Sequence, residues 1–320
     1  MSSPAKLRPA PPFAAVVPPT LYSLGSAPAA WPAPTVASRA ELEELLGDDV
    51  PYGDLTTDAL GIGAAAGSMQ FTARDMMVLA LAEDAAAIIE LAGCRVELFA
   101  SSGTLLEPGS PILTAHGPAS ALLRSWKVAQ TLIEIWSGVA TDAGAIVAAA
   151  TAVAPKIAVA CTRKNVPGTK RFAVAAVKSG GAVMHRLGLS ETVLVFPEHR
   201  AFLREVPLAD FVEQLRRVAP EKRLVIEVTT LQEAVEAAVA GFDVIQAEKF
   251  APAEIASLVA RMKAMASVWN RPVVAAAGGI RAENVAAYAQ AGADIVVTSS
   301  PYLARPRDVQ VRIAPSSADQ

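Results

Sequence analysis

The sequence predicts an α/β protein, in which an α+β region is followed by a parallel α/β barrel. Six short apolar runs recur after Gly138 and lack the every-second-residue alternation of half-exposed strands, which is typical of parallel strands covered on both faces. Ala-rich helical stretches, such as 231–240 and 282–291, separate most of these runs. Because strands and helices alternate in this way, the pattern favours a parallel barrel over a sandwich.

The region before Gly138 mixes short strands and helices, which predicts an α+β layer. Gly93 ends one of its helices, and the Glu107-Pro-Gly-Ser segment supplies a turn between two strands. A third helix has apolar residues at close to the helical period. We expect helices at residues 40–46, 82–91 and 120–136, and strands at 68–73, 96–99 and 112–115.

The barrel strands and their flanks set the expected domain boundaries. We place the strands at 157–161, 192–196, 224–228, 244–247, 273–277 and 295–297. We expect a disordered Pro/Ala-rich extension over 1–38, an N-terminal domain over 39–137, a barrel domain over 138–300 and a C-terminal tail over 301–320.

The composition excludes several classes of protein. The net charge of −3 argues against a nucleic-acid binder that works by bulk charge, and 52% hydrophobic residues exclude a disordered chain. The uncharged run 9–38 contains eight prolines and the run 143–155 has only 13 residues, so we expect no membrane-spanning helix. Two distant cysteines favour a reduced, cytoplasmic protein. No pair of histidines has zinc-ligand spacing, so we expect no protein-only metal site.

Charged side chains gather at the carboxyl ends of the expected barrel strands, where parallel barrels hold their active sites. Arginine and lysine there suit a multiply charged anion, glutamates suit a divalent cation or a positively charged carbon, and a glycine pair can bind phosphate through its bare amides. The candidates are Arg163, Lys164, Lys170, Arg171, His185, Arg186, Glu227, Glu248, Gly278, Gly279, Thr298 and Ser299. Alternatively, Lys170 and Arg171 are solvated surface charges, His185 is a core histidine and Glu227 caps a helix.

Two motifs make the sequence similar to a known family. The segments Thr162-Arg-Lys-Asn-Val-Pro-Gly168 and His185-Arg-Leu-Gly-Leu189 resemble those of the quinolinate phosphoribosyltransferases, or nicotinate-nucleotide pyrophosphorylases. Within that family the chain resembles the ModD branch, which is associated with molybdenum transport. The similarity covers about residues 40–300. Supporting motifs are Asp49-Val-Pro-Tyr-Gly-Asp-Leu-Thr-Thr57, Ala73-Arg-Asp75, Ser137-Gly-Val-Ala-Thr141, Ile226-Glu-Val228 and Ala277-Gly-Gly-Ile280.

This resemblance implies a type II phosphoribosyltransferase with an N-terminal α/β open sandwich and an incomplete six-stranded α/β barrel. It implies a homodimer in which the N-terminal domain of one subunit covers the barrel of the other. It also implies phosphoribosyl pyrophosphate and Mg²⁺ as substrate and cofactor. A ring nitrogen of a heteroaromatic acceptor replaces pyrophosphate at the anomeric carbon, and quinolinate then loses its 2-carboxylate.

The resemblance assigns roles to the candidate residues. Lys164, with Mg²⁺, would neutralise the leaving pyrophosphate, and Glu227 and Glu248 would stabilise positive charge on the ribose carbon. The remaining residues would bind substrate. The 5′-phosphate would rest on Gly278, Gly279, Thr298 and Ser299, and the acceptor side would use Arg163, His185, Arg186, Lys127 and Lys170.

Departures from the family pattern concentrate in the acceptor pocket. Lys127 and Lys170 stand where the family usually has arginine, and Phe196 stands where it has a lysine that contacts quinolinate. Further departures are Thr131, Val174, Val183, Met184, Glu248 and Lys249. Most of these changes remove cations or hydrogen-bond donors, so a second quinolinate carboxylate would be left unpaired. We predict that quinolinate is a poor substrate and that the acceptor is a less charged heteroaromatic carboxylate.

Two other functions remain open from the sequence. The chain could be a non-catalytic binding or regulatory protein of a molybdenum-uptake system, or a barrel aldolase that uses Lys164 as a Schiff base. Retention of Arg163, Lys164, Glu227 and Glu248 together favours the transferase.

Overall fold

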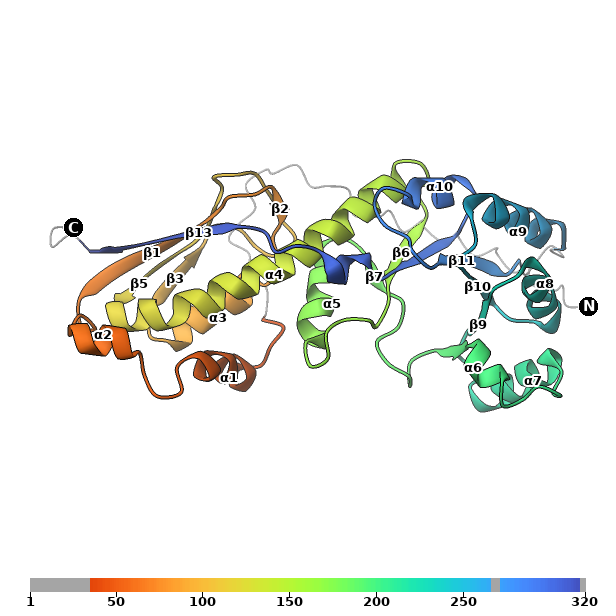
Figure 1. Cartoon of the computed structure of the whole chain (residues 1–320), viewed down its shortest axis with the longest axis horizontal. Coiled ribbons are helices and arrows are strands. Elements are labelled where there is room, and N and C mark those ends of the chain that lie inside the picture. Colours follow the sequence, from red (N-terminus) through yellow and green to blue (C-terminus); the bar gives the residue numbers. More distant parts are fainter. Residues whose placement is uncertain (1–34, 266–270, 317–320) are drawn as a thin grey trace, which may run out of the picture. The chain divides into compact units, whose positions relative to one another are not determined.

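The computed structural model describes residues 35–265 and 271–316, which form two main sheets and a two-stranded ribbon (Figure 1). The first sheet is antiparallel, with the order β13-β1-β5-β3. Its strands are β1 (Ala66–Ala73), β3 (Arg95–Leu98), β5 (Pro111–Pro118) and β13 (Val309–Pro315), and the ribbon joins β2 (Met77–Val78) to β4 (Leu105–Leu106). Helices of this region are α1 (Arg39–Asp49), α2 (Leu55–Leu60), α3 (Ala82–Leu91) and α4 (Ala119–Thr151).

Helices α3 and α4 pack against each other and against the antiparallel sheet (Figure 1). Burial alternates along β1, so mainly one face of the sheet is covered. This arrangement is the expected open sandwich. The predicted helices 40–46 and 82–91 and the three predicted strands of this region are confirmed to within a few residues.

Helix α4 corrects the expected boundary at residue 137. The predicted helix ends at residue 136, but α4 continues without a break to Thr151. Gly138 does not end the helix. A Cβ at this position would collide with the carbonyl oxygen of Arg305, so glycine lets the chain that leaves the barrel cross α4 closely. By length and composition α4 is long and apolar enough to span a membrane, and half of its most apolar stretch is buried inside the fold.

The C-terminal residues correct the expected tail over 301–320. Strand β13 pairs with β1 along its whole length, from Pro315 opposite Gly67 to Val309 opposite Ala73. The chain therefore returns from the barrel and adds an edge strand to the N-terminal sheet. Apolar residues at Val309, Val311 and Ile313 alternate, and this period of two is the signal that could have predicted the strand.

The second sheet is parallel and has the order β7-β6-β12-β11-β10-β9-β8. Its strands are β6 (Ala158–Cys161), β7 (Val183–Met184), β8 (Val193–Val195), β9 (Leu224–Val228), β10 (Val244–Glu248), β11 (Val273–Ala277) and β12 (Ile295–Thr298). The six predicted strands are confirmed, and β7 is an additional one. Among the described residues the edge strands β7 and β8 do not pair, so the barrel is incomplete, as expected.

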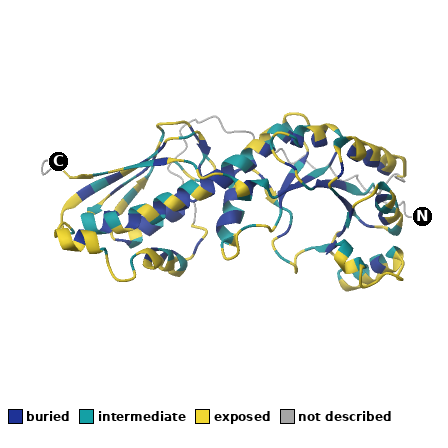
Figure 2. Cartoon of the chain, in the orientation of Figure 1, coloured by how far each residue is buried: buried dark blue, intermediate teal, exposed yellow. Residues whose placement is uncertain are grey.

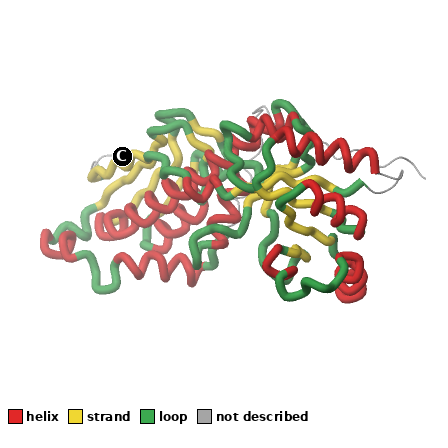
Figure 3. Tube along the Cα trace, turned by 45° about the vertical axis from the view of Figure 1, so that its right-hand side comes forward, coloured by secondary structure: helices red, strands yellow, loops and turns green. Residues whose placement is uncertain are grey.

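Helices cover the outside of the curled parallel sheet (Figure 3). They are α5 (Lys170–Ser179), α6 (Pro197–Arg200), α7 (Leu208–Val218), α8 (Leu231–Ala240), α9 (Pro252–Met265) and α10 (Val285–Gln290), and a 3₁₀ turn, η1 (Ser300–Leu303), follows β12. The inside of the curl has its own small apolar cluster, which includes Leu194, Val225, Val244, Ala275 and Val297. Buried residues therefore occur on both faces of the barrel strands (Figure 2).

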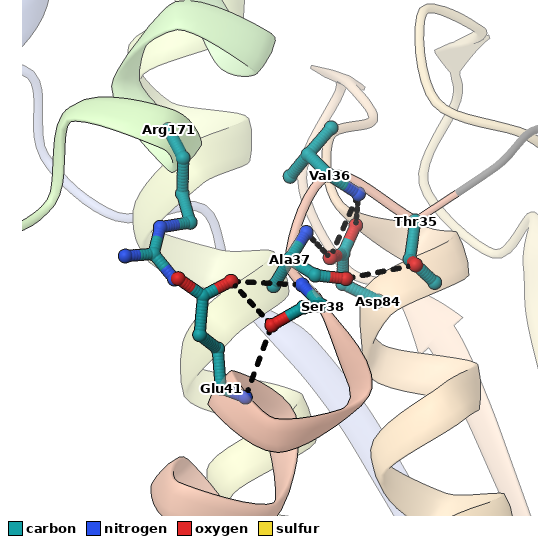
Figure 4. A network of polar contacts seen from close by, with 7 residues as sticks. All are labelled: Thr35, Val36, Ala37, Ser38, Glu41, Asp84 and Arg171. Carbon is teal, nitrogen blue, oxygen red and sulfur yellow. Dashed lines mark hydrogen bonds and ion pairs between the residues drawn. The ribbon is translucent and has the colours of Figure 1, made fainter.

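The N-terminal end of the described chain is anchored to α3 (Figure 4). Asp84 is buried and accepts hydrogen bonds from the backbone amides of Val36 (3.1 Å) and Ala37 (2.9 Å). Ser38 then caps α1 through a reciprocal capping box with Glu41, and Glu41 forms an ion pair with Arg171 of α5. Residues 1–34 of the expected disordered extension lie outside the described residues, whereas residues 35–38 are fixed by these contacts.

Replacing Asp84 with alanine should lower the free energy of unfolding by about 1–3 kcal/mol, because backbone amides lose their acceptor. Asp84→Asn is the control, since its amide oxygen can still accept both bonds. Burial raises the pKa of Asp84 above the usual 3.8, so the contribution of this carboxyl to stability falls as pH rises through the raised pKa. Urea denaturation should therefore show Asp84→Asn gaining stability relative to wild type as the pH rises above the usual carboxyl pKa of 3.8. Equal stability of all three chains would contradict the anchor.

Candidate active site

A cavity of about 930 Å³ opens at the carboxyl ends of the barrel strands. Every strand of the parallel sheet contributes to its wall, either directly or through the loop that follows. The structure brings together all of the predicted site residues except Lys127, Lys170 and Arg171. Those that line the cavity are Arg163, Lys164, His185, Arg186, Glu227, Glu248, Gly278, Gly279, Thr298 and Ser299.

One side of the cavity is cationic. His185 and Arg186 follow β7, and the His185 backbone amide donates to the carbonyl oxygen of Cys161 on β6 (2.8 Å). Arg186 is only 7% exposed, and its guanidinium lies 5.6 Å from the centre of the Phe196 ring, which comes from the other edge strand of the sheet. Burial, and then the nearby charge of Arg163, lower the pKa of Arg186.

No carboxylate of the described residues forms an ion pair with Arg186. A buried guanidinium without a counter-ion is costly unless a ligand supplies the negative charge. This side of the cavity therefore suits an anionic group such as a carboxylate.

The opposite side of the cavity holds the carboxylates of Glu227 on β9 and Glu248 on β10. Glu227 accepts a hydrogen bond from the side-chain amide of Gln246 (2.7 Å). Burial raises the pKa of Glu227, the Gln246 bond opposes this, and the charges of Glu248 and Glu198 raise it further. Lys164 lies close enough to lower it again. These carboxylates can stabilise a positive charge on a bound substrate.

The loop after β11 forms a cradle beside Glu248. Gly278 and Gly279 have φ of 92° and 71°, which place them in the left-handed region that glycine adopts readily. The Gly279 carbonyl accepts from the Asn284 side chain (3.0 Å), which fixes the loop. Lys249, which follows Glu248, also has a positive φ of 60°, and its amide donates to the carbonyl oxygen of Ala277 (2.8 Å). Exposed amides in such a loop can bind a phosphate.

Thr298 shapes the loop after β12. Its hydroxyl donates to the carbonyl oxygen of Ile280 (2.6 Å) and accepts from the backbone amide of Ser300 (3.0 Å). Because this buried hydroxyl already has both partners, it positions the neighbouring glycine loop. The predicted contact of Thr298 with phosphate therefore does not fit its side chain, whereas Ser299 lines the cavity.

Comparison with known families decides what kind of protein this is. The family model of the quinolinate phosphoribosyl transferase N-terminal domain matches residues 54–137, and that of the C-terminal domain matches residues 139–312. The chain belongs to the quinolinate phosphoribosyltransferase family. This family comprises type II phosphoribosyltransferases, so the expected family and fold are confirmed.

Individual relatives agree with the family assignment. The ModD protein of Rhodobacter capsulatus is 49% identical over 245 residues, which cover 77% of this chain and 93% of the relative. The human carboxylating nicotinate-nucleotide pyrophosphorylase is 31% identical over 268 residues, 82% of this chain and 86% of the relative. The crystal structure of NadC from Streptococcus pyogenes has the same fold, with a TM-score of 0.78, 24% identity and coverage of 87% and 96%. The expected similarity to the ModD branch is thus confirmed.

Three of the predicted site residues lie outside the cavity of their own chain. Arg171 of α5 instead forms an ion pair with Glu41 of α1. Lys127 is exposed on α4, where its ammonium lies 4.1 Å from the centre of the Trp126 ring and donates to Gln130 (3.2 Å). Lys170 is exposed at the start of α5. The structure of one chain therefore does not bring these cations to the site.

The sequence did not predict four polar cavity residues, Gln246, Glu198, His199 and Arg281. Gln246 lies inside a buried strand, and Glu198 and His199 follow Phe196 in α6. The His199 Nδ1 atom accepts from the Phe196 backbone amide (2.9 Å), and the two rings stack with 5.8 Å between their centres. A polar residue within the apolar run 244–247 was the available signal for Gln246.

The carboxylates fit the family's Mg²⁺ only in part. Among residues 35–265 and 271–316 no cluster of three acidic, histidine or cysteine side chains could hold a metal ion alone. Glu227 and Glu248 nevertheless line one side of the cavity together. Mg²⁺ commonly binds through one or two carboxylates together with substrate phosphates, so this pair suits an ion that arrives with its substrate.

Proposed function

We propose that this chain transfers a phosphoribosyl group from phosphoribosyl pyrophosphate to the ring nitrogen of a heteroaromatic carboxylate. The supporting observation is the division of one cavity into a cationic side around the buried, unpaired Arg186 and an opposite side with Glu227, Glu248 and the glycine cradle. These two sides suit an anionic acceptor and a phosphorylated donor whose reacting carbon becomes positive.

The bond changes in this transfer balance without an oxidant or a proton donor. The bond from the anomeric carbon to the pyrophosphate oxygen breaks, and pyrophosphate leaves with its electron pair. The lone pair of the ring nitrogen forms the new bond to carbon. Glu227 and Glu248 stabilise the positive charge on the carbon between these two events, and Lys164 neutralises the leaving group. Arg163 and Arg186 orient the acceptor through its carboxylate.

Glu227 and Glu248 are the residues of this chain that would hold Mg²⁺ together with the pyrophosphate. Bound there, Mg²⁺ supplies charge neutralisation to the leaving group. The cradle of Gly278 and Gly279 would receive the 5′-phosphate, since both glycines line the same cavity.

The acceptor is proposed to carry less negative charge than quinolinate. Phe196 lines the cavity where the quinolinate enzymes place a lysine, and Glu198 adds a negative charge beside it. A second carboxylate on the acceptor would meet an aromatic ring and an acid instead of a cation, which opposes its burial. A heteroaromatic ring with one carboxylate avoids this loss.

The proposal includes a homodimer in which Lys127 reaches the cavity of the partner chain. Lys127 is exposed and does not line the cavity of its own chain. Its positive charge suits an anionic substrate bound to a second copy of the chain. Sedimentation equilibrium is the direct test of the dimer.

Calorimetry should detect binding of phosphoribosyl pyrophosphate that requires Mg²⁺, and pyrophosphate release should be faster with single-carboxylate acceptors than with quinolinate.

Phe196→Lys should raise quinolinate turnover by about 10- to 100-fold, the effect of one hydrogen bond to a charged group. Phe202→Lys is the matched control, because Phe202 is highly exposed and does not line the cavity. Absence of donor binding would refute the transferase. Wild-type turnover of quinolinate above that of every single-carboxylate acceptor tested would refute only the altered pocket.

A further inference from the structure

Gln246 is an unusual residue for its position. It stands in the middle of β10, where Val244, Ile245 and Ala247 are apolar and buried. Its own side chain is only 5% exposed, yet it lines the cavity. It shares the inward side of the strand with Val244 below it and Glu248 above it, because side chains alternate along a strand. Gln246 therefore lies at the floor of the site.

The orientation of the Gln246 amide is fixed by Glu227. The two residues are directly opposite each other on the paired strands β9 and β10, and Nε2 of Gln246 donates to Oε2 of Glu227 at 2.7 Å. An ionised carboxylate only accepts hydrogen bonds, so the amide nitrogen must point to Glu227 and the amide oxygen must point away. The structure therefore defines the direction of both ends of this side chain.

The Gln246 carbonyl oxygen has no hydrogen-bond partner among the described residues. His185 lines the same cavity as Gln246. Burial and the charge of Arg186 lower the pKa of His185, and Gln246 partly restores it, which is consistent with an imidazole within reach of the amide. His185 belongs to the opposite, cationic side of the cavity. Gln246 thus reaches from the carboxylate side to the cationic side.

This arrangement works against stability. A buried polar atom without a partner costs free energy, so the carbonyl end of Gln246 is unfavourable although its amide N–H is bonded to Glu227. An amide retained at such a site is better explained by function than by packing.

We propose that Gln246 is a positioning residue that links Glu227 on the donor side of the cavity to His185 on the acceptor side. Its amide N–H holds the Glu227 carboxylate in place for the donor, and its carbonyl oxygen receives an N–H from His185 when the site is occupied. Removal of either partner then alters the binding of a ligand that touches only the other. This inference rests on the proposed function.

The test uses the full chain, with phosphoribosyl pyrophosphate and Mg²⁺ as the probe. Gln246→Met keeps the size of the side chain and removes both polar ends. It should weaken donor binding in calorimetry by about 10- to 100-fold, as expected for the loss of a hydrogen bond to a charged group. Its thermal unfolding midpoint should change little, because removal of the unpaired carbonyl oxygen offsets the lost bond to Glu227. Ile245→Met, a buried neighbour that does not line the cavity, should change neither donor binding nor the site.

A double-mutant cycle separates linkage from a merely structural role. His185→Phe keeps a ring and removes the N–H, and it should weaken donor binding several-fold in the wild-type background but add little to Gln246→Met. Additive effects of the two substitutions on donor binding would overturn the linkage. So would unchanged donor binding by Gln246→Met. A loss of stability in Gln246→Met large enough to explain its weaker binding would also overturn it. If wild type itself does not bind the donor, the proposed function fails first. If wild type binds and Gln246→Met binds equally well, only this inference fails.

Discussion

Replacing Lys164 with alanine is expected to slow pyrophosphate release by about 100- to 1000-fold, with little effect on the stability of the fold. The expected loss is that of one preorganised group that meets charge developing in the transition state. Lys164 lies in the exposed loop after β6. Its backbone amide donates a hydrogen bond to the side-chain hydroxyl of Thr162 (3.3 Å), which helps to fix the loop. Its charge lowers the pKa of Glu227, which places the ammonium near the carboxylates.

The stability of the chain should not depend on Lys164, because its ammonium forms no ion pair with the described residues. Lys178→Ala is the matched control, since it removes an exposed lysine of α5 that does not line the cavity and has no predicted role in binding. Lys164→Arg should retain part of the rate, because charge is preserved while the geometry of the point charge is lost. Steady-state release of pyrophosphate measures all three variants. A Lys164→Ala enzyme with more than about a tenth of wild-type turnover would remove Lys164 from the chemistry.

The strand pattern explains why the barrel could be predicted before the structure was known. Strands covered on both faces need continuous apolar runs, and six such runs were long enough to recognise. Strand β7 has only two residues, which is too short for any period to appear. The C-terminal strand β13 was missed for a different reason, since its partner β1 lies over 200 residues away and only its alternation signals it.

The rule that reactive groups follow parallel strands located most of the site, since each barrel strand contributes to one mouth. It could not find Gln246, which lies within a strand, because the run around it was interpreted as apolar throughout. Side chains alternate along a strand, so Val244, Gln246 and Glu248 point to the same side of β10, and this alternation would have placed Gln246 in the cavity together with Glu248. Lys127 was placed in the site by family resemblance alone, and the single chain shows it on the surface of α4.

Gly278→Ala is expected to lower the free energy of unfolding by about 2–5 kcal/mol, from two separate causes. A left-handed backbone costs about 1–2 kcal/mol for a residue with a side chain, and Gly278 has a φ of 92°. A Cβ at this position would also lie 2.9 Å from the backbone nitrogen of Lys249 and 2.8 Å from its Cγ. Overpacking of this kind costs about 1–3 kcal/mol. Lys249 cannot easily yield, because its own φ of 60° is already strained.

Gly279→Ala isolates the first cause, the left-handed backbone. Gly279 also has a positive φ, 71°, but a Cβ there would meet no atom within 4 Å. Chemical denaturation should therefore show a loss of only about 1–2 kcal/mol for Gly279→Ala, and the difference between the two variants is the cost of the collision with Lys249 and Glu248. Gly279→Ala should nevertheless weaken donor binding, although it lowers stability less than Gly278→Ala. The methyl group added by Gly279→Ala would occupy open space at the cavity wall and weaken binding of phosphoribosyl pyrophosphate. Equal stability of Gly278→Ala and Gly279→Ala would contradict the collision, because it would show that the loop around Lys249 is free to move.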